Sequence, residues 1–264
     1  KKRKENGNEE WAVLRNFKAT EIVNHASDVD KTIDTIRMAI NKMTDETKEA
    51  RIKEIKQNLN DIKTKENYNE NINKISNIIF DIACGNKFYS NLYAELLLEL
   101  MTECPEMKDI FNSNLSNYLK VYEKIDYVDA NTDYEQFCVL NKENENRRAL
   151  STFLFNLVGN KLISNNIIHD LLDSMRVDIS TMITQDNKKY IIDEIMENIM
   201  IFITGENAQD IILYNYESKD KLLSYIRTIA MMNANTNKEK YPSLSSKLIF
   251  KCEDILDILE DDED

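Results

Sequence analysis

The chain has 264 residues, of which only 4 are glycine and 2 are proline. So few turn-forming residues exclude a sheet-rich fold and predict an all-α protein. The formal net charge of −13 at pH 7 argues against nucleic acid as the main partner, because affinity for phosphate comes mainly from Lys and Arg.

The chain begins with a segment that lacks clear helical periodicity. We expect residues 1–26 to be extended or partly disordered, with a basic start at Lys1 to Lys4. Trp11 is the only tryptophan of the chain. Its ring either covers an apolar groove of this protein or anchors a partner, since tryptophan is enriched among interface hot spots.

Helical periodicity starts after Ser27 and Asp30, which have the spacing of a capping box. Apolar residues then recur every three or four positions in successive stretches, which predicts amphipathic helices. Gly85 is expected to end one helix and Pro105 to open another. The stretches in this half cover residues 29–43, 52–62, 72–82, 92–100 and 105–125.

The middle of the chain, residues 131–172, predicts two long helices joined by about five residues. Gly159 ends the first and Ser164 can cap the second, so we expect an antiparallel pair. The polar lead-in at 133–146 predicts a projecting helix start or loop. Three further helices are expected at 190–203, ended by Gly205, at 222–230, and at 244–259, opened by Pro242.

About ten helices in pairs of roughly 40–50 residues have the period of HEAT-like arrays. The predicted fold is therefore an all-α, HEAT-like α-solenoid of about five antiparallel helix pairs. We expect a single domain over 27–260, followed by an acidic tail at 261–264. Such arrays leave long surfaces free for partners, which is typical of a scaffold.

No motif for catalysis or for a bound cofactor is recognisable. The sequence has no phosphate-binding G-x-x-x-x-G-K, no H-E-x-x-H, no G-x-S-x-G and no Rossmann fingerprint. His25 and His169 stand apart, and we expect His169 to make a hydrogen bond on a helix surface. We expect no enzyme activity, no cofactor and no metal.

The cysteines and the hydropathy bear on the compartment. The cysteines form no C-x-x-C pair and are expected to be reduced core thiols. No apolar run has the length of a membrane span, and we recognise no signal peptide. A reducing, cytoplasmic location without membrane contact is expected. The cysteines are Cys84, Cys104, Cys138 and Cys252.

Four blocks of the sequence resemble the middle domain of eukaryotic translation initiation factor 4 gamma. The first block, at 36–44, is IRMAINKMT, which is similar to a family helix that ends in L-N-K-L-T. The second block, at 78–100, is IIFDIACGNKFYSNLYAELLLEL, which is similar to an I-F-x-x-A run followed by F-x-x-x-Y-A. Residues 147–172 resemble its R-R-x-S-L … I-M-H-D block, and SSKLIFKCEDIL at 245–256 its S-S-R-I-R-F-M-L-Q-D-V-L helix. The blocks occur in the family's order and cover the chain from about residue 29 onward.

The resemblance implies a translation initiation scaffold of the HEAT type. Middle domains of this family bind the DEAD-box RNA helicase initiation factor 4 A and hold its two lobes in a productive arrangement. Some members also contact mRNA or initiation factor 3. The family's cap-binding-protein motif, Y-x-x-x-x-L followed by an apolar residue, is not found. The bias towards Asn, Ile and Lys favours an AT-rich genome, such as that of a giant DNA virus or a protist.

Two other functions remain open at this stage. Related middle-domain proteins act in mRNA decay, nuclear cap binding, splicing and translational repression. Direct RNA binding by the domain is the other alternative, although the net charge opposes it.

The resemblance implies helicase-binding residues near both ends of the chain. Lys48 and Ile249 depart from the family pattern, the first replacing an aromatic residue and the second a basic one. For Ile40, Met43 and Phe250, packing in the core is an equally weighted interpretation. The residues that match are Trp11, Ile40, Met43, Lys247, Phe250 and Asp254.

Overall fold

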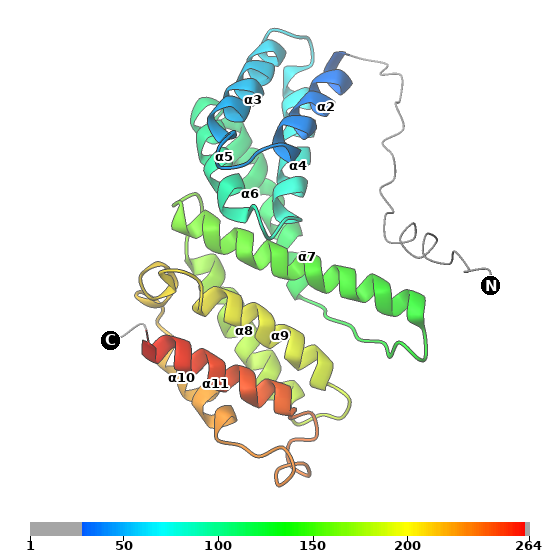
Figure 1. Ribbon diagram of the computed structural model, residues 1–264, viewed down its shortest axis with the longest axis vertical. Helices are drawn as coiled ribbons and strands as arrows, with labels where there is room; N and C mark the ends of the chain where they lie inside the picture. Colours follow the sequence, from blue (N-terminus) through cyan, green and yellow to red (C-terminus); the bar gives the residue numbers. More distant parts are fainter. Residues whose placement is uncertain (1–27, 262–264) are drawn as a thin grey trace, which may run out of the picture.

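The computed structural model of the protein describes residues 28–261, and every regular element in this part of the chain is helical (Figure 1). This confirms the predicted all-α solenoid. The predicted lead-in with Trp11 and residues 262–264 lie outside the described residues. The helices are α2 (Asp28–Asn41), α3 (Lys48–Lys63), α4 (Tyr68–Cys84), α5 (Ser90–Glu103), α6 (Glu106–Leu119), α7 (Tyr134–Gly159), α8 (Asn166–Met182), α9 (Lys189–Ile203), α10 (Lys219–Ala230) and α11 (Ser246–Asp261), with short helical segments η1 (Lys120–Tyr122) and η2 (Gln209–Leu213).

Alternate helices stack on one another in two layers. In one layer α3 packs on α5, α5 on α7, α7 on α9, and α9 on α11. In the other, α2 packs on α4 and α4 on α6, and farther along α8 packs on α10. Contacts between α2 and α3, α4 and α5, α8 and α9, and α10 and α11 join the layers. Each helix therefore buries one face against its pair and another against the next repeat, as in a solenoid.

The antiparallel pair predicted for residues 131–172 is only partly right. A short turn does lead from α7 into α8, but α7 packs mainly against α5, α9 and α4, while α8 packs on α9 and α10. Periodicity identifies the apolar face of a helix but not the helix that covers it. The polar lead-in at 133–146 is confirmed as the projecting start of α7, which extends beyond the stack in Figure 1.

The apolar stripes found in the sequence form one continuous core from Ile33 to Leu259. Its largest fully buried rings are Phe80, Phe153 and Phe202 on α4, α7 and α9. Burial of apolar surface contributes about 25 cal/mol per Å², so these rings and the isoleucines around them are the main favourable contribution to the fold.

A chain of buried polar groups crosses the interface between α7 and α9. The Ser151 hydroxyl donates to Asn198 Oδ1 at 2.8 Å and accepts from the Tyr122 hydroxyl at 2.7 Å. The Asn198 side-chain amide donates to the Glu194 main-chain oxygen at 2.7 Å. Because each member has a partner, the burial of these groups does not carry the cost of an unsatisfied donor or acceptor.

Arg147 fixes the same interface to the segment before α7. Its side chain is almost completely buried, and its Nε donates to the Val121 carbonyl at 2.6 Å. Its guanidinium also donates to Asn144 and lies 3.9 Å from Glu194 Oε1. The arginine therefore ties η1, α7 and α9 together.

Some helix ends are formed by the residues that the sequence predicts, and others are not. The left-handed backbone conformation occurs at Lys161 and Asn207, among other residues, while the glycines described have negative φ. Pro242 lies four residues before α11, whose first turn is instead capped by Ser245, since its Oγ accepts from Leu248 N at 2.9 Å. Gly85 does end α4, with its N–H donating to the Asp81 carbonyl, and Pro105 directly precedes α6, so the prediction is right at these two ends and wrong at Pro242.

Gly205 is required by a close contact rather than by its φ. A Cβ built on Gly205 would lie 2.6 Å from Cζ of Phe155. Phe155 is a buried ring of α7, so it cannot simply turn into solvent. A Cβ built on Gly159 would lie 3.6 Å from Ile211 Cδ1, which is an ordinary contact.

We predict that Gly205→Ala lowers the free energy of unfolding by about 1–3 kcal/mol, the usual cost of overpacking a core. Gly159→Ala is the matched control, and it should leave stability unchanged or raise it by about 0.5 kcal/mol because alanine favours the helix. Urea unfolding followed by circular dichroism measures both. Equal stability of the two variants would contradict the close packing of Gly205 on Phe155.

Candidate protein-binding surface on the last helix

The structure separates the residues that the sequence suggested for binding into buried and exposed groups. Ile40 and Met43 are only 1% and 2% exposed, and both belong to the continuous core. Neither side chain is available for direct contact with a partner, so their role is to pack the first repeat. Of their two interpretations, core packing is the one that the structure shows.

Lys247, Phe250 and Asp254 lie on α11, and all three are exposed. Spacings of three and four place them on one face of the helix. Phe250 is 61% exposed. The opposite face of α11 is buried through Leu248, Cys252, Ile255 and Leu259. The three residues therefore form a ridge, which we call the α11 ridge.

A hollow of about 220 Å³ lies beside Phe250. Ile249 and Phe250 form one wall, and the segment that follows α10 forms the other. The Asn233 side chain shapes this segment, because its Oδ1 accepts from Asn235 N at 2.9 Å. Met232 lines the hollow, and Met231, which precedes it in the chain, is 87% exposed. An exposed ring beside a hollow that a methionine lines is suited to contacts with apolar side chains of a protein.

The ridge is fixed to α9 by polar contacts at its base. Ser245 Oγ donates to Asp193 Oδ1 at 2.7 Å. One turn further along α9, Glu197 pairs with Lys251 at 2.8 Å and with Lys247 at 3.4 Å. The Glu197 carboxylate thus holds Lys247 at the edge of the exposed face.

The two neighbouring glutamates of α9 titrate in opposite directions. Burial raises the pKa of Glu194 above its usual value, even though Arg148 and Arg147 favour the charged form. Burial also acts to raise the pKa of Glu197, but Lys251 and Lys247 outweigh it and the pKa is lowered. The difference follows from what α7 and α11 place against each carboxyl group.

Sequence reasoning missed two features of this surface. The segment after α10 was not assigned to it, because no periodic pattern connects an asparagine-rich loop with a helix farther along the chain. Ile249 is 8% exposed and contributes to the core. The adjacent apolar pair Leu248 and Ile249 was the available sign that this side of the helix is buried.

Groups that bind metal ions or act as nucleophiles are the ones that bear on chemistry in the described residues. No group of His, Cys, Asp and Glu that could hold a metal ion occurs in residues 28–261. The cysteines are free, and burial raises the pKa of both Cys84 and Cys252 to about 12, which keeps these thiols protonated.

His169 differs from its expected place on a helix surface. It is buried, its Nε2 lies 2.7 Å from the Ile212 carbonyl, and its ring stacks on Tyr216 with centroids 4.8 Å apart. Because a carbonyl only accepts, Nε2 carries the proton. The residue joins α8 to the segment before α10.

Within residues 28–261, no helix combines the length and the apolar character needed to cross a membrane. Comparison with protein-family models and with curated proteins gave no match.

We predict opposite pH dependences for Glu194→Gln and Glu197→Gln. The fold disfavours the ionised form of Glu194. The contribution of this side chain to stability is therefore complete below the unfolded pKa of about 4.3, where the carboxyl group is protonated, and it is lost as the pH rises through the raised folded pKa. Ionised Glu197 is favoured, so its contribution is present above about pH 4.3 and is lost as the pH falls through the lowered folded pKa.

Relative to the unmodified protein, Glu194→Gln should therefore become more stable as the pH rises from about 4.3 towards neutrality. Glu197→Gln should become relatively more stable as the pH falls below about 4.3. Urea unfolding at a series of pH values measures both. Parallel pH profiles for the two variants would contradict the assignment of opposite shifts.

Proposed function

We propose that this protein is a scaffold that binds another protein through the α11 ridge. The observation that supports this proposal most directly is the exposure of the Phe250 ring, on a helix whose other face is buried in the core. Interfaces concentrate their binding energy in a few such aromatic anchors surrounded by polar residues. Lys247 and Asp254 supply charges of opposite sign on the same face, which favours one orientation of the partner.

The partner that we propose is the DEAD-box RNA helicase initiation factor 4 A, and the proposed process is translation initiation in the cytoplasm. Support comes from the resemblance of residues 245–256 to the last helix of the initiation factor 4 gamma middle domain. It also comes from the exposure of three of the residues that this resemblance selects. Ile40 and Met43 are buried, so we propose that neither side chain touches the helicase directly.

The mechanism that we propose is stabilisation of one arrangement of the helicase lobes. The stacked helices share one continuous core, so the separations between contacts on their surface are set by how the helices pack. A partner with two lobes populates its productive arrangement more when a rigid surface binds that arrangement best. The protein would thereby promote recruitment of mRNA to the ribosome through the helicase.

Calorimetric titration of the full chain with the helicase tests this proposal. We predict that Phe250→Ala weakens binding about tenfold or more, the effect typical of an interface hot spot. Asp254→Lys should also weaken it, because the charge on the ridge is reversed. Tyr214→Ala is the matched control, since this ring is 79% exposed on another part of the surface.

Circular dichroism separates loss of binding from loss of structure. Phe250→Ala should keep the helical spectrum. Ile40→Ala should lower the free energy of unfolding by about 2–5 kcal/mol, because it leaves a cavity in the core.

No binding at tens of micromolar would overturn the proposed partner. Unfolding by Phe250→Ala would show that the ring is part of the core. Capture of a different DEAD-box helicase would instead favour one of the related middle-domain functions.

A further inference from the structure

The exposed face of α11 is acidic beyond the Phe250 ring. Successive residues of an α-helix are turned by about 100° around its axis, so residues three, four and seven positions after Phe250 share its face. At these positions stand Glu253, Asp254 and Asp257, all of them exposed, and the exposed Glu260 follows on the flank of the same face. We call these four residues the acidic end of α11. The negative charge therefore lies on the surface from which the Phe250 ring projects.

The lysines of α11 do not neutralise this charge. Lys251 pairs with Glu197 of α9 at 2.8 Å, and its side chain is only 14% exposed. Lys247 lies 3.4 Å from the same carboxylate. Within residues 28–261, no lysine or arginine forms an ion pair with the acidic end of α11. Its carboxylates are therefore available to a partner.

The acidic end is unfavourable for the helix that carries it. Asp257 follows Glu253 by four residues and Asp254 by three, which are spacings at which like charges repel each other. The C-terminal end of a helix has partial negative charge and is stabilised by cations, yet the last turn of α11 has no basic residue. Proteins break local rules of this kind mainly at functional surfaces. Basic side chains of a partner relieve both repulsions.

The other end of the face is neutral. The hollow of about 220 Å³ beside Phe250 is lined by side chains without charge, among them Met232, Ala234 and Ile249. Such a lining accepts an apolar side chain more readily than a charged one. From Phe250 to Glu260 the face measures about 15 Å at 1.5 Å per residue. A segment that covers this face thus meets an apolar hollow at one end and carboxylates at the other.

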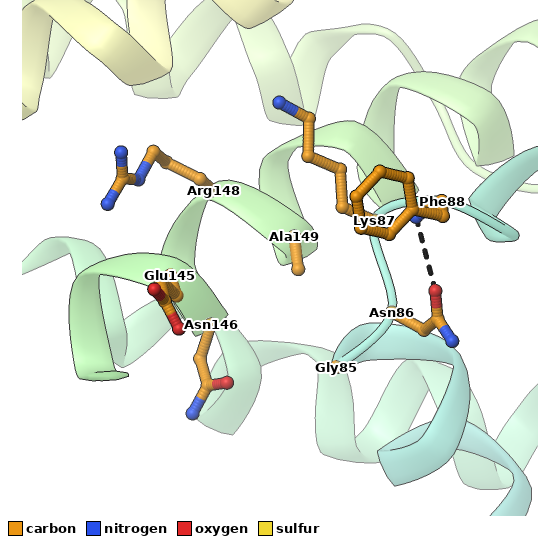
Figure 2. A pocket seen from close by; sticks show the side chains of 8 residues that line it. All are labelled: Gly85, Asn86, Lys87, Phe88, Glu145, Asn146, Arg148 and Ala149. Carbon is orange, nitrogen blue, oxygen red and sulfur yellow. Dashed lines mark hydrogen bonds between the residues drawn. The ribbon is translucent and has the colours of Figure 1, made fainter. Parts of the chain in front are cut away.

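Charge distinguishes this face from the hollow of about 560 Å³ between the α4–α5 turn and α7 (Figure 2). Phe88 is exposed there too, on a turn that Asn86 fixes by accepting from Phe88 N at 3.1 Å. Lys87 and Arg148 line that hollow together with Glu145, so charges of both signs occur on it. Complementarity of charge selects no class of partner for that hollow, whereas on α11 it selects a basic one.

We propose that the exposed face of α11 binds a basic segment of its partner protein. An apolar residue of that segment enters the hollow beside Phe250, and its lysine or arginine side chains lie over Asp254 and Asp257. This contact rests on the proposed function, because it uses the same α11 ridge, and it specifies which chemistry the partner presents there. Opposite charges at one end and an apolar contact at the other give the bound segment a single direction along α11.

Two synthetic helical peptides of about four turns test this proposal on the full chain. Both carry the same leucines at one end, followed by lysines in one peptide and by glutamates in the other. Fluorescence anisotropy of the labelled peptides measures binding, and we expect the lysine peptide to bind at least about tenfold more tightly. Its binding should weaken when sodium chloride is raised from about 0.1 M to about 1 M, because the screening length falls from about 10 Å to about 3 Å.

Charge reversal at one position assigns the binding to α11. Asp257→Lys should weaken binding of the lysine peptide about fivefold or more, and Phe250→Ala should weaken it as well. The reversal should not lower the urea concentration at which the protein unfolds, because it removes repulsion within α11. Glu66→Lys is the matched control. It changes the net charge equally, at an exposed residue between α3 and α4 at the other end of the molecule (Figure 1), and should leave binding unchanged.

Equal binding of the two peptides would overturn the proposal, and so would equal weakening by Asp257→Lys and Glu66→Lys. Self-association in sedimentation experiments that Phe250→Ala abolishes would also overturn it, since the occupant would be a second copy of this chain.

Titration with the helicase separates the basic segment from the proposed partner. Helicase binding that neither Asp257→Lys nor salt weakens would contradict the basic segment and leave the proposed partner standing. Selective binding of the lysine peptide without any binding of the helicase would support the basic segment and contradict the proposed partner.

Discussion

The packing of α7 between α5 and α9 is the contact on which the rest of the structure depends. The helices before α7 and those after it meet mainly through this one element, which packs on α4 and α5 on one side and on α9 on the other. On the α5 side the Asn156 amide donates to Ser90 Oγ at 2.9 Å, and on the α9 side the Ser151 and Asn198 bridge is completely buried. Buried hydrogen bonds of this kind fix a register that apolar packing alone leaves free.

This arrangement determines where surfaces for partners can exist. Because α7 joins the two halves with its second half only, its first half projects and keeps a face uncovered. At the end of the chain α11 has a neighbour on one side in its layer, α9, and its outer face carries Phe250. Among the described helices, exposed faces of this kind occur where a helix has a neighbour on one side only or is longer than its neighbours.

Much of the fold could be predicted because helical periodicity is a local property. The isoleucine and leucine stripes predicted nearly every helix, and the polar start of α7 correctly indicated that this part projects. The neighbours of each helix could not be predicted in the same way, because stripes on different helices are interchangeable. The partners of α7 and the contact of Gly205 with Phe155 depend on packing between distant segments.

The candidate site was predictable only in part for the same reason. Lys247 and Asp254 carry charges and are therefore exposed by default. Ile40, Met43 and Phe250 are all apolar members of helical patterns, and nothing in their spacing separates the exposed ring from the two buried side chains. Which face of a terminal helix is covered depends on the neighbour, here α9, and on the loop after α10 that lines the hollow.

Native-state hydrogen exchange across a series of urea concentrations tests most directly whether α7 makes the two halves one unit. Amides of α5, before the junction, and of α9, after it, should then lose protection together, in the same global opening as the second half of α7. Exchange of α9 at urea concentrations where α5 remains protected would contradict this, because the halves would unfold independently and α7 would be a linker between them.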